Sequence, residues 1–227
     1  MAASPDVPKA TRPRWLPYAI GGGVLVVIAV VLIVIFVIKP GGGAQTGLSA
    51  KTPKFDFQLV STKAILGADH SSGDPQAVAQ KAGNDIKTVL DRMYSLAFLD
   101  PDVWQSGNYS AVYGFFDQGA AADKAKADAA TLTLGQNAGK KFSTVQPAGG
   151  TLAVKVLVDK GGTPVSATAA VTFQAKATGK GGPSDMVLSK GQYFMHILEG
   201  GWTILGFSVS RGDHQVAGGP TPSGSSS

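Results

Sequence analysis

Residues 151–174, TLAVKVLVDKGGTPVSATAAVTFQ, decide the fold of this chain. Apolar side chains take every second position in two runs, first at Leu152, Val154, Val156 and Val158 and then at Val165, Ala167, Ala169, Val171 and Phe173. A period of two is typical of strands that bury one face and expose the other. The glycines of Lys160-Gly161-Gly162-Thr163, between the runs, indicate a turn. The stretch therefore predicts two antiparallel strands.

A second hairpin is predicted nearer the C-terminus. Met186–Glu199 and Trp202–Arg211 flank Gly200-Gly201, and glycine suits a two-residue hairpin turn because the turn needs positive φ. We expect Glu199 to pair with Trp202, and His196 with Leu205. One face would then carry Phe194, His196, Leu198, Thr203, Leu205, Phe207 and Val209, and the other Tyr193, Met195, Ile197, Trp202 and Ile204. Both faces are apolar, so we expect both to be covered.

Helical patterns precede these strands. Asp74-Pro75 puts a capping carboxylate before a proline that suits the first turn, and apolar residues recur behind it at helical spacing as far as about Leu99. Asp100-Pro101 repeats this start, and Gly107 would break or bend the second helix. The alanine-rich residues 120–131 predict a third helix.

The order of these elements indicates the fold class. Phe55, Phe57 and Leu59 alternate with polar residues, as in a short strand or an extended lead-in. Helices then come first and antiparallel strands last, which is typical of an α+β domain. We therefore expect three helices packed on one face of a curved antiparallel sheet.

An uncharged segment lies ahead of this domain. Residues 15–38 contain no charge, and residues 19–38 are apolar or glycine throughout. Twenty helical residues span about 30 Å, the thickness of a bilayer's hydrocarbon core. A cleaved signal peptide is the alternative, although its apolar region is shorter, about 7–15 residues. We expect a transmembrane helix at residues 16–38, which makes the lipid bilayer a partner.

The flanking charges do not decide the orientation of this segment. Three basic residues lie on each side, Lys9, Arg12 and Arg14 before it and Lys39, Lys51 and Lys54 after it. Long domains cross a membrane largely regardless of charge, so the short tail is the easier side to retain. We expect a single-pass protein of the cell membrane with residues 1–15 as a cytoplasmic tail and the C-terminal domain extracytoplasmic.

Composition sets the other boundaries. The glycine-rich stretch after residue 39 predicts a flexible linker at 39–54, followed by a folded domain at 55–212. Residues 213–227 are mostly Gly, Pro and Ser, which predicts a disordered tail. Arg211-Gly212-Asp213, at this border, spells the integrin-binding tripeptide, which we interpret as a chance match.

Several kinds of chemistry are excluded or unsupported. The chain has no cysteine, which excludes disulfides, thiolate metal sites and cysteine nucleophiles. Its net charge of +5 is diffuse, so we expect no nucleic-acid partner. His70, His196 and His214 are far apart in sequence, and we expect neither a metal site nor a cofactor. No catalytic set is apparent from the spacing, so we expect a protein that is not an enzyme.

The long first helix, the Leu99–Trp104 junction and the closing hairpin Tyr193–Val209 resemble the nuclear transport factor 2-like superfamily over about residues 74–211. The resemblance implies a cone-shaped domain in which helices close over a strongly bent sheet. Within this superfamily the chain is most similar to the membrane-anchored actinobacterial type found in the cell envelope, such as the mammalian-cell-entry-associated membrane proteins. Some members of the superfamily are isomerases, dehydratases or hydrolases with polar side chains inside the cone.

Seven residues are candidates for lining the cone or forming an interface: Tyr94, Trp104, Tyr113, Tyr193, His196, Trp202 and Phe207. Three functions remain open. The first, which we favour, is an accessory protein that docks on an envelope protein or forms a homodimer through its sheet. The second is a module that holds an apolar or lipid-like ligand in the cone. The third is a small-molecule enzyme of the isomerase or dehydratase type.

Overall fold

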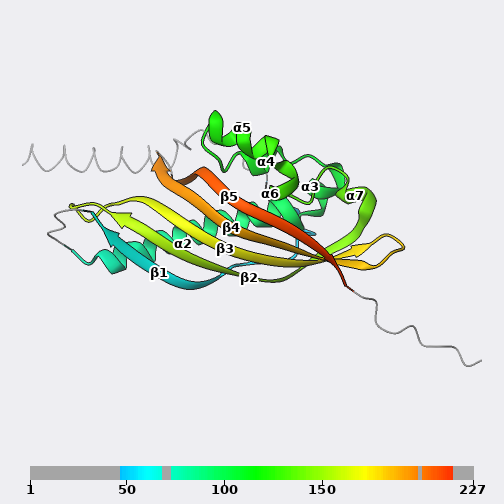
Figure 1. Ribbon diagram of the computed structural model, residues 1–227, viewed down its shortest axis with the longest axis horizontal. Helices are drawn as coiled ribbons and strands as arrows, with labels where there is room; N and C mark the ends of the chain where they lie inside the picture. The colour runs from blue at the N-terminus through cyan, green and yellow to red at the C-terminus, as the bar shows by residue number, and fades with distance from the viewer. Residues whose placement is uncertain (1–46, 68–72, 199–200, 217–227) are drawn as a thin grey trace, which may run out of the picture. The chain divides into compact units, whose positions relative to one another are not determined.

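Figure 1 shows a computed structural model of the chain, in which residues 47–67, 73–198 and 201–216 are described. The described residues form an α+β domain with a curved sheet in the order β1-β2-β3-β4-β5. The strands are β1 Gln58–Leu66, β2 Phe142–Val158, β3 Pro164–Gly179, β4 Ser184–Leu198 and β5 Gly201–Gln215. The two hairpins expected from alternation, β2–β3 and β4–β5, are both confirmed.

The helices of the described residues lie between β1 and β2 in the chain. They are α2 Pro75–Tyr94, the π-helix η1 Ser95–Leu99, α3 Pro101–Ser106, α4 Ser110–Tyr113, α5 Ala120–Ala127, α6 Ala129–Leu132 and α7 Ala138–Lys141. Helix α2 packs on β1 and β2, whereas α5 and α6 contact β5 (Figure 1). The three helices expected from the sequence are thus present, but short helices accompany them and the third is divided at Asp128.

The helix starts follow from local sequence. The Asp74 carboxylate accepts hydrogen bonds from the backbone amides of Gln76 and Ala77, at 3.0 and 3.1 Å. Asp100 caps α3 in the same way through the amide of Asp102, at 3.0 Å. Gly107 ends α3 with φ 71°, a left-handed conformation that glycine adopts without steric cost. Both predicted starts and the predicted break are confirmed.

The sheet is mixed, and the expectation of a purely antiparallel sheet is wrong. Strand β1 pairs in parallel with β2, with Ile65 opposite Leu157. The reason lies in the connection, because all the helices of the described residues come between these two strands and a long crossover permits parallel pairing. The short strand expected at Phe55–Leu59 instead begins at Gln58 and continues to Leu66.

The register of the second hairpin also differs from the prediction. Trp202 pairs with Ile197, and His196 pairs with Thr203, so the expected pairs Glu199–Trp202 and His196–Leu205 are wrong. Glu199 and Gly200 lie outside the described residues. A β-bulge follows, because Phe194 pairs with Gly206 while Met195 pairs with Ile204, which leaves Leu205 as an extra residue.

The bulge changes which side chains share a face. Beyond it, Phe207 pairs with Tyr193, and its ring contacts that of Tyr193 with centroids 6.5 Å apart. Phe207 and Val209 therefore lie on the helix-covered face, whereas the alternation alone put them with Phe194. The grouping of Phe194, His196, Leu198, Thr203 and Leu205 on the other face is retained.

A partly buried ion pair attaches the start of β1 to α2. The Asp91 carboxylate accepts a hydrogen bond from the Phe57 amide at 2.7 Å and one from the Lys87 ammonium at 2.7 Å. Lys87 also donates to Asp56 at 2.8 Å. Further upstream, within the expected linker, the Ser49 amide donates to the buried Asp100 at 2.8 Å. Side-chain acceptors on the helices thus hold the lead-in to β1 in place.

The C-terminal strand runs past the predicted end of the domain. Strand β5 continues to Gln215, which pairs with Asp185. Arg211 forms an ion pair with Asp213 at 2.5 Å and donates to the carbonyl oxygens of Ala130 and Thr133. The tripeptide at 211–213 is therefore part of β5, and its charged side chains bond within the domain.

The predicted transmembrane helix at 16–38 lies outside the described residues. Among the helices of the described part, none has the length and apolar character that crossing a membrane requires.

Replacing Asp91 by Ala tests the attachment of β1. We expect a loss of about 2 kcal/mol in the free energy of unfolding, because the Phe57 amide and Lys87 both lose a charged acceptor. Asp85→Ala is the matched control, since Asp85 forms only an exposed pair with Lys81 and should cost less than about 1 kcal/mol. Denaturant unfolding of the full chain in mild detergent measures both, and equal losses would contradict the attachment.

Candidate docking surface

Two tyrosines meet at the centre of the helix-covered face. The Tyr94 hydroxyl lies 3.1 Å from that of Tyr193 and 3.1 Å from the Ser189 hydroxyl, and all three residues are buried. Burial raises the pKa of Tyr94 to about 12 and the pKa of Tyr193 well above its ordinary value. Both phenols therefore keep their protons at neutral pH, where they hydrogen-bond to each other and supply no base.

Aromatic side chains surround this pair. The rings of Phe57, Phe98 and Phe173 lie with their centroids 5.0, 5.4 and 5.1 Å from that of Tyr94. All of them are at most 1% exposed. Tyr94 and Tyr193, expected to line the cone or to form an interface, lie in a packed aromatic core.

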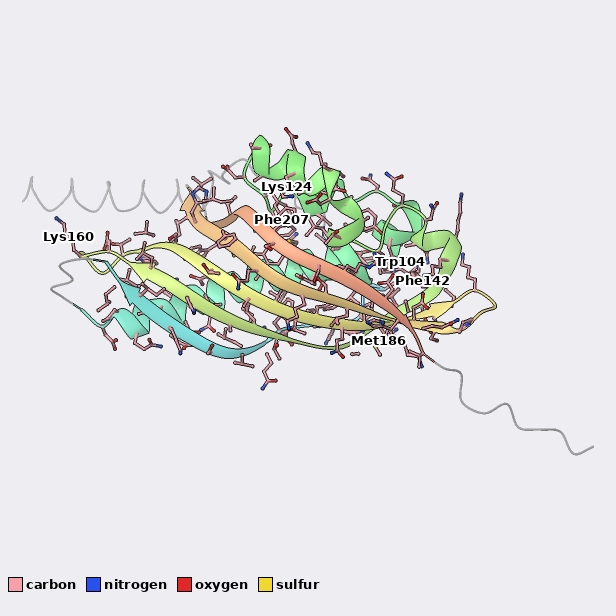
Figure 2. All side chains as sticks on the ribbon, viewed as in Figure 1. Trp104, Lys124, Phe142, Lys160, Met186 and Phe207 are labelled. Atoms are coloured by element: carbon pink, nitrogen blue, oxygen red, sulfur yellow. The ribbon has the colours of Figure 1, made fainter. Side chains whose placement is uncertain are left out.

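The other candidates do not join them in one site. Phe207 contacts Tyr193 and lies 5.5 Å from the ring of Phe116, also within the core. Trp104 is buried on α3, away from Phe207 (Figure 2), and its indole nitrogen has no hydrogen-bond partner among the described residues. Trp202 is buried at the start of β5, and Tyr113 is half-buried on α4, where burial raises its pKa.

His196 lies on the opposite face of the sheet, which we call the outer face. This face carries the strand residues that alternate with the buried ones, such as Ser166, Thr168 and Thr172 on β3. The helices pack on the other face, so the expectation that both faces of the second hairpin are covered fails within the described domain. Phe194, on the outer face, is 46% exposed.

Exposed apolar side chains gather at one end of the sheet. Eight of the eleven large apolar side chains that are exposed in the described residues lie where β1, β2 and β4 finish and β3 and β5 begin. This group, the apolar end, consists of Ile65, Leu66, Leu157, Val165, Phe194, Ile197, Leu198 and Leu205. One row of paired residues runs across it from Ile65 through Leu157, Ser166 and His196 to Thr203.

His196 is in the middle of this row. Its neighbours along the same face of β4 are Phe194 and Leu198, both about half exposed. The His196 Nε2 atom is itself buried and has no hydrogen-bond partner among the described residues. His196 and Tyr193 lie on opposite faces of β4, so the sheet separates the histidine from the tyrosine pair and the two do not form an acid–base site.

The two edges of the sheet are partly occupied. On β1, the Gln76 side chain accepts from the Ala64 amide at 3.3 Å and donates to the Thr62 carbonyl at 2.8 Å, as a neighbouring strand would. On β5, the Asp117 amide donates to the Ile204 carbonyl, and the Ile204 amide donates to the Phe115 carbonyl. These contacts block edge-to-edge pairing at these positions.

We find no built polar site in the described domain. A hollow of about 260 Å³ is lined in part by Ser49, Asp100 and Asp102, but both Asp100 oxygens already accept backbone hydrogen bonds. No group of three or more His, Asp or Glu side chains in the described residues is arranged to hold a metal ion.

The sequence pattern placed only three of the eight residues of the apolar end together on one face. Phe194, Leu198 and Leu205 were identified as one face, but Ile65 and Leu66 were not connected with them. No local signal connects them, because Ile65 meets Leu157 only through the parallel pairing of β1 and β2.

Alanine substitutions distinguish core from surface. We expect Trp202→Ala to lower the free energy of unfolding by about 3–5 kcal/mol, because Trp202 is only 8% exposed. Phe194→Ala removes a similar aromatic side chain from the outer face and should cost no more than about 1 kcal/mol. Denaturant unfolding followed by circular dichroism tests both, and a large loss for Phe194→Ala would mean that the outer face is packed.

The chain has no significant match among protein-family models. It likewise matches no curated protein and no solved structure.

Proposed function

We propose that this chain is a non-enzymatic accessory protein of the cell membrane, anchored by the apolar segment at 16–38, whose extracytoplasmic domain works by docking. The docking surface is the apolar end, to which both faces of the sheet contribute: Leu66, Val165 and Ile197 follow the alternation of the buried residues, and the others belong to the outer face. The proposal rests on one observation above all, the gathering of eight exposed apolar side chains at one end of an otherwise well-packed domain. A contiguous apolar patch on a domain surface is typical of an interaction site.

The packed interior favours docking over ligand binding. A cone that holds an apolar ligand needs space lined by aromatic residues, with a few polar groups to orient the ligand. Here the central aromatic residues contact one another, and the hydroxyls of Tyr94, Tyr193 and Ser189 are engaged with each other. A ligand at this place would have to displace these contacts.

Catalysis also lacks support from the described residues. An isomerase or dehydratase needs a base with a tuned pKa next to a donor for the developing charge. The buried tyrosines are held protonated by burial, and His196 lies across the sheet from them. The Asp91 carboxylate already accepts hydrogen bonds from the Phe57 amide and from Lys87.

The fold is compatible with the nuclear transport factor 2-like resemblance. A curved sheet with helices on one face, closed by the β4–β5 hairpin, is the arrangement that this resemblance implies. We propose that the chain is an envelope protein of the actinobacterial, membrane-anchored type on this basis and on that of the segment at 16–38.

Cysteine labelling tests whether the apolar end is covered in a membrane. The chain has no native cysteine, so a single thiol at Val165→Cys, a position 46% exposed in the domain, reports on this end alone. We expect a bulky maleimide to label this thiol several-fold more slowly in native membranes than after solubilisation in detergent.

Lys81→Cys is the control for that experiment. Lys81 is on the exposed side of α2, with a side chain 81% exposed, and should label equally fast in both conditions. Equal labelling of Val165→Cys in membranes and detergent would show that nothing covers the apolar end and would overturn the docking function.

A further inference from the structure

Charge is distributed unequally over the two sides of the sheet. Within the described strands the outer face carries four lysines and no acidic residue; the lysines are Lys63, Lys155, Lys176 and Lys190. The two acidic residues in these strands, Asp185 and Asp213, follow the alternation of the helix side, and both are in ion pairs. The outer face is therefore a cationic surface.

Two of the lysines adjoin the apolar end directly. Lys63 on β1 lies opposite Lys155 on β2 in the parallel register, and the next pair toward the end of the strands on that face is Ile65–Leu157. Like charges that face each other across two strands are unfavourable. Neither lysine has an ion-pair partner in the described part of the chain, so an anion outside the domain would relieve their repulsion.

The sequence of rows suits a lipid surface. On β1 and β2, Ile65 and Leu157 occupy the last row of the outer face, and the lysine pair stands one row behind them. The row of the lysines continues through Thr168 to the exposed Phe194, and Lys160 lies at the tip of the β2–β3 hairpin (Figure 2). A protein that enters a bilayer interface buries apolar side chains at the acyl boundary and keeps lysines level with the anionic headgroups. The Ile65–Leu157 pair and the lysine pair behind it reproduce this order on β1 and β2.

A second copy of the chain fits this surface less well. Two outer faces in contact would bring together eight lysines, four from each copy, with no acidic side chain from the described strands to pair with them. A protein interface usually has its apolar residues at the centre and polar residues around them, whereas here the apolar residues are at one end.

We infer that the apolar end, with Lys63 and Lys155 behind it, docks on an anionic lipid bilayer. This inference rests on the proposed docking function and names its partner. The apolar side chains enter the interface between headgroups and acyl chains, and the two ammonium groups contact lipid phosphates.

Reconstitution in lipid of known composition tests this partner. The full chain with Val165→Cys, labelled with an environment-sensitive fluorophore, is placed in single-copy nanodiscs of phosphatidylcholine alone or of phosphatidylcholine with phosphatidylglycerol. We expect blue-shifted emission, and quenching by spin-labelled lipid, only with phosphatidylglycerol. The shift should diminish as salt is raised, because screening shortens the reach of the lysine charges.

A charge-matched pair of variants locates the contact. Lys63→Gln with Lys155→Gln should lower the ratio of docked to free domain about 30-fold, since each lysine near an anionic surface contributes roughly fivefold. Lys81→Gln with Lys126→Gln removes the same charge from the helix side, where both lysines are exposed, and should leave the ratio nearly unchanged.

Other results would overturn the inference. Equal emission with and without phosphatidylglycerol, or equal losses in the two double variants, would exclude specific docking on anionic lipid. If Val165→Cys were protected in native membranes yet insensitive to lipid in nanodiscs, the occupant would be a protein and the docking function would stand. If protection were absent in native membranes too, the docking function itself would fail.

Discussion

The packing of Tyr94 against its aromatic neighbours is the interaction on which the rest of the domain depends. Tyr94 ends α2, yet its ring contacts Phe57 ahead of β1, Phe98 in η1 and Phe173 in β3, and its hydroxyl meets Tyr193 and Ser189 of β4. One side chain thus connects the helix layer with three separate parts of the sheet layer. The π-helix η1, which joins α2 to α3, and the lead-in to β1 both contact Tyr94.

The packed interior of the described domain disfavours ligand binding on the helix-covered face. Because the buried phenols hydrogen-bond to one another, the helix-covered face has no free polar group at its centre to orient a ligand. The partly occupied edges limit strand addition as well. The outer face, which no helix of the described domain covers, is cationic along the strands and apolar at one end, and it is the surface that we propose for docking.

The bulge in β5 determines the composition of both faces. By inserting Leu205 as an extra residue, it directs Phe207 and Val209 into the core while Leu205 stays outside beside Phe194. Without it, a strict alternation would place Phe207 on the outer face, as the sequence pattern predicts. A single added residue therefore moves apolar area from the outer face into the core.

The sequence by itself determined the elements whose causes are local. Period-two runs predicted the hairpins, and the Asp-Pro pairs at 74–75 and 100–101 predicted where two helices begin, because caps and alternation act within a few residues. Only the tertiary structure decided the parallel pairing of β1, the hairpin register and the joining of Ile65 to Leu157. These depend on contacts between residues separated by the whole helical region, or on a bulge that the alternation does not reveal. The sequence accordingly identified exposed apolar residues of this end on β4 and β5 but not on β1, because the local sequence of β1 does not show which strand pairs with it.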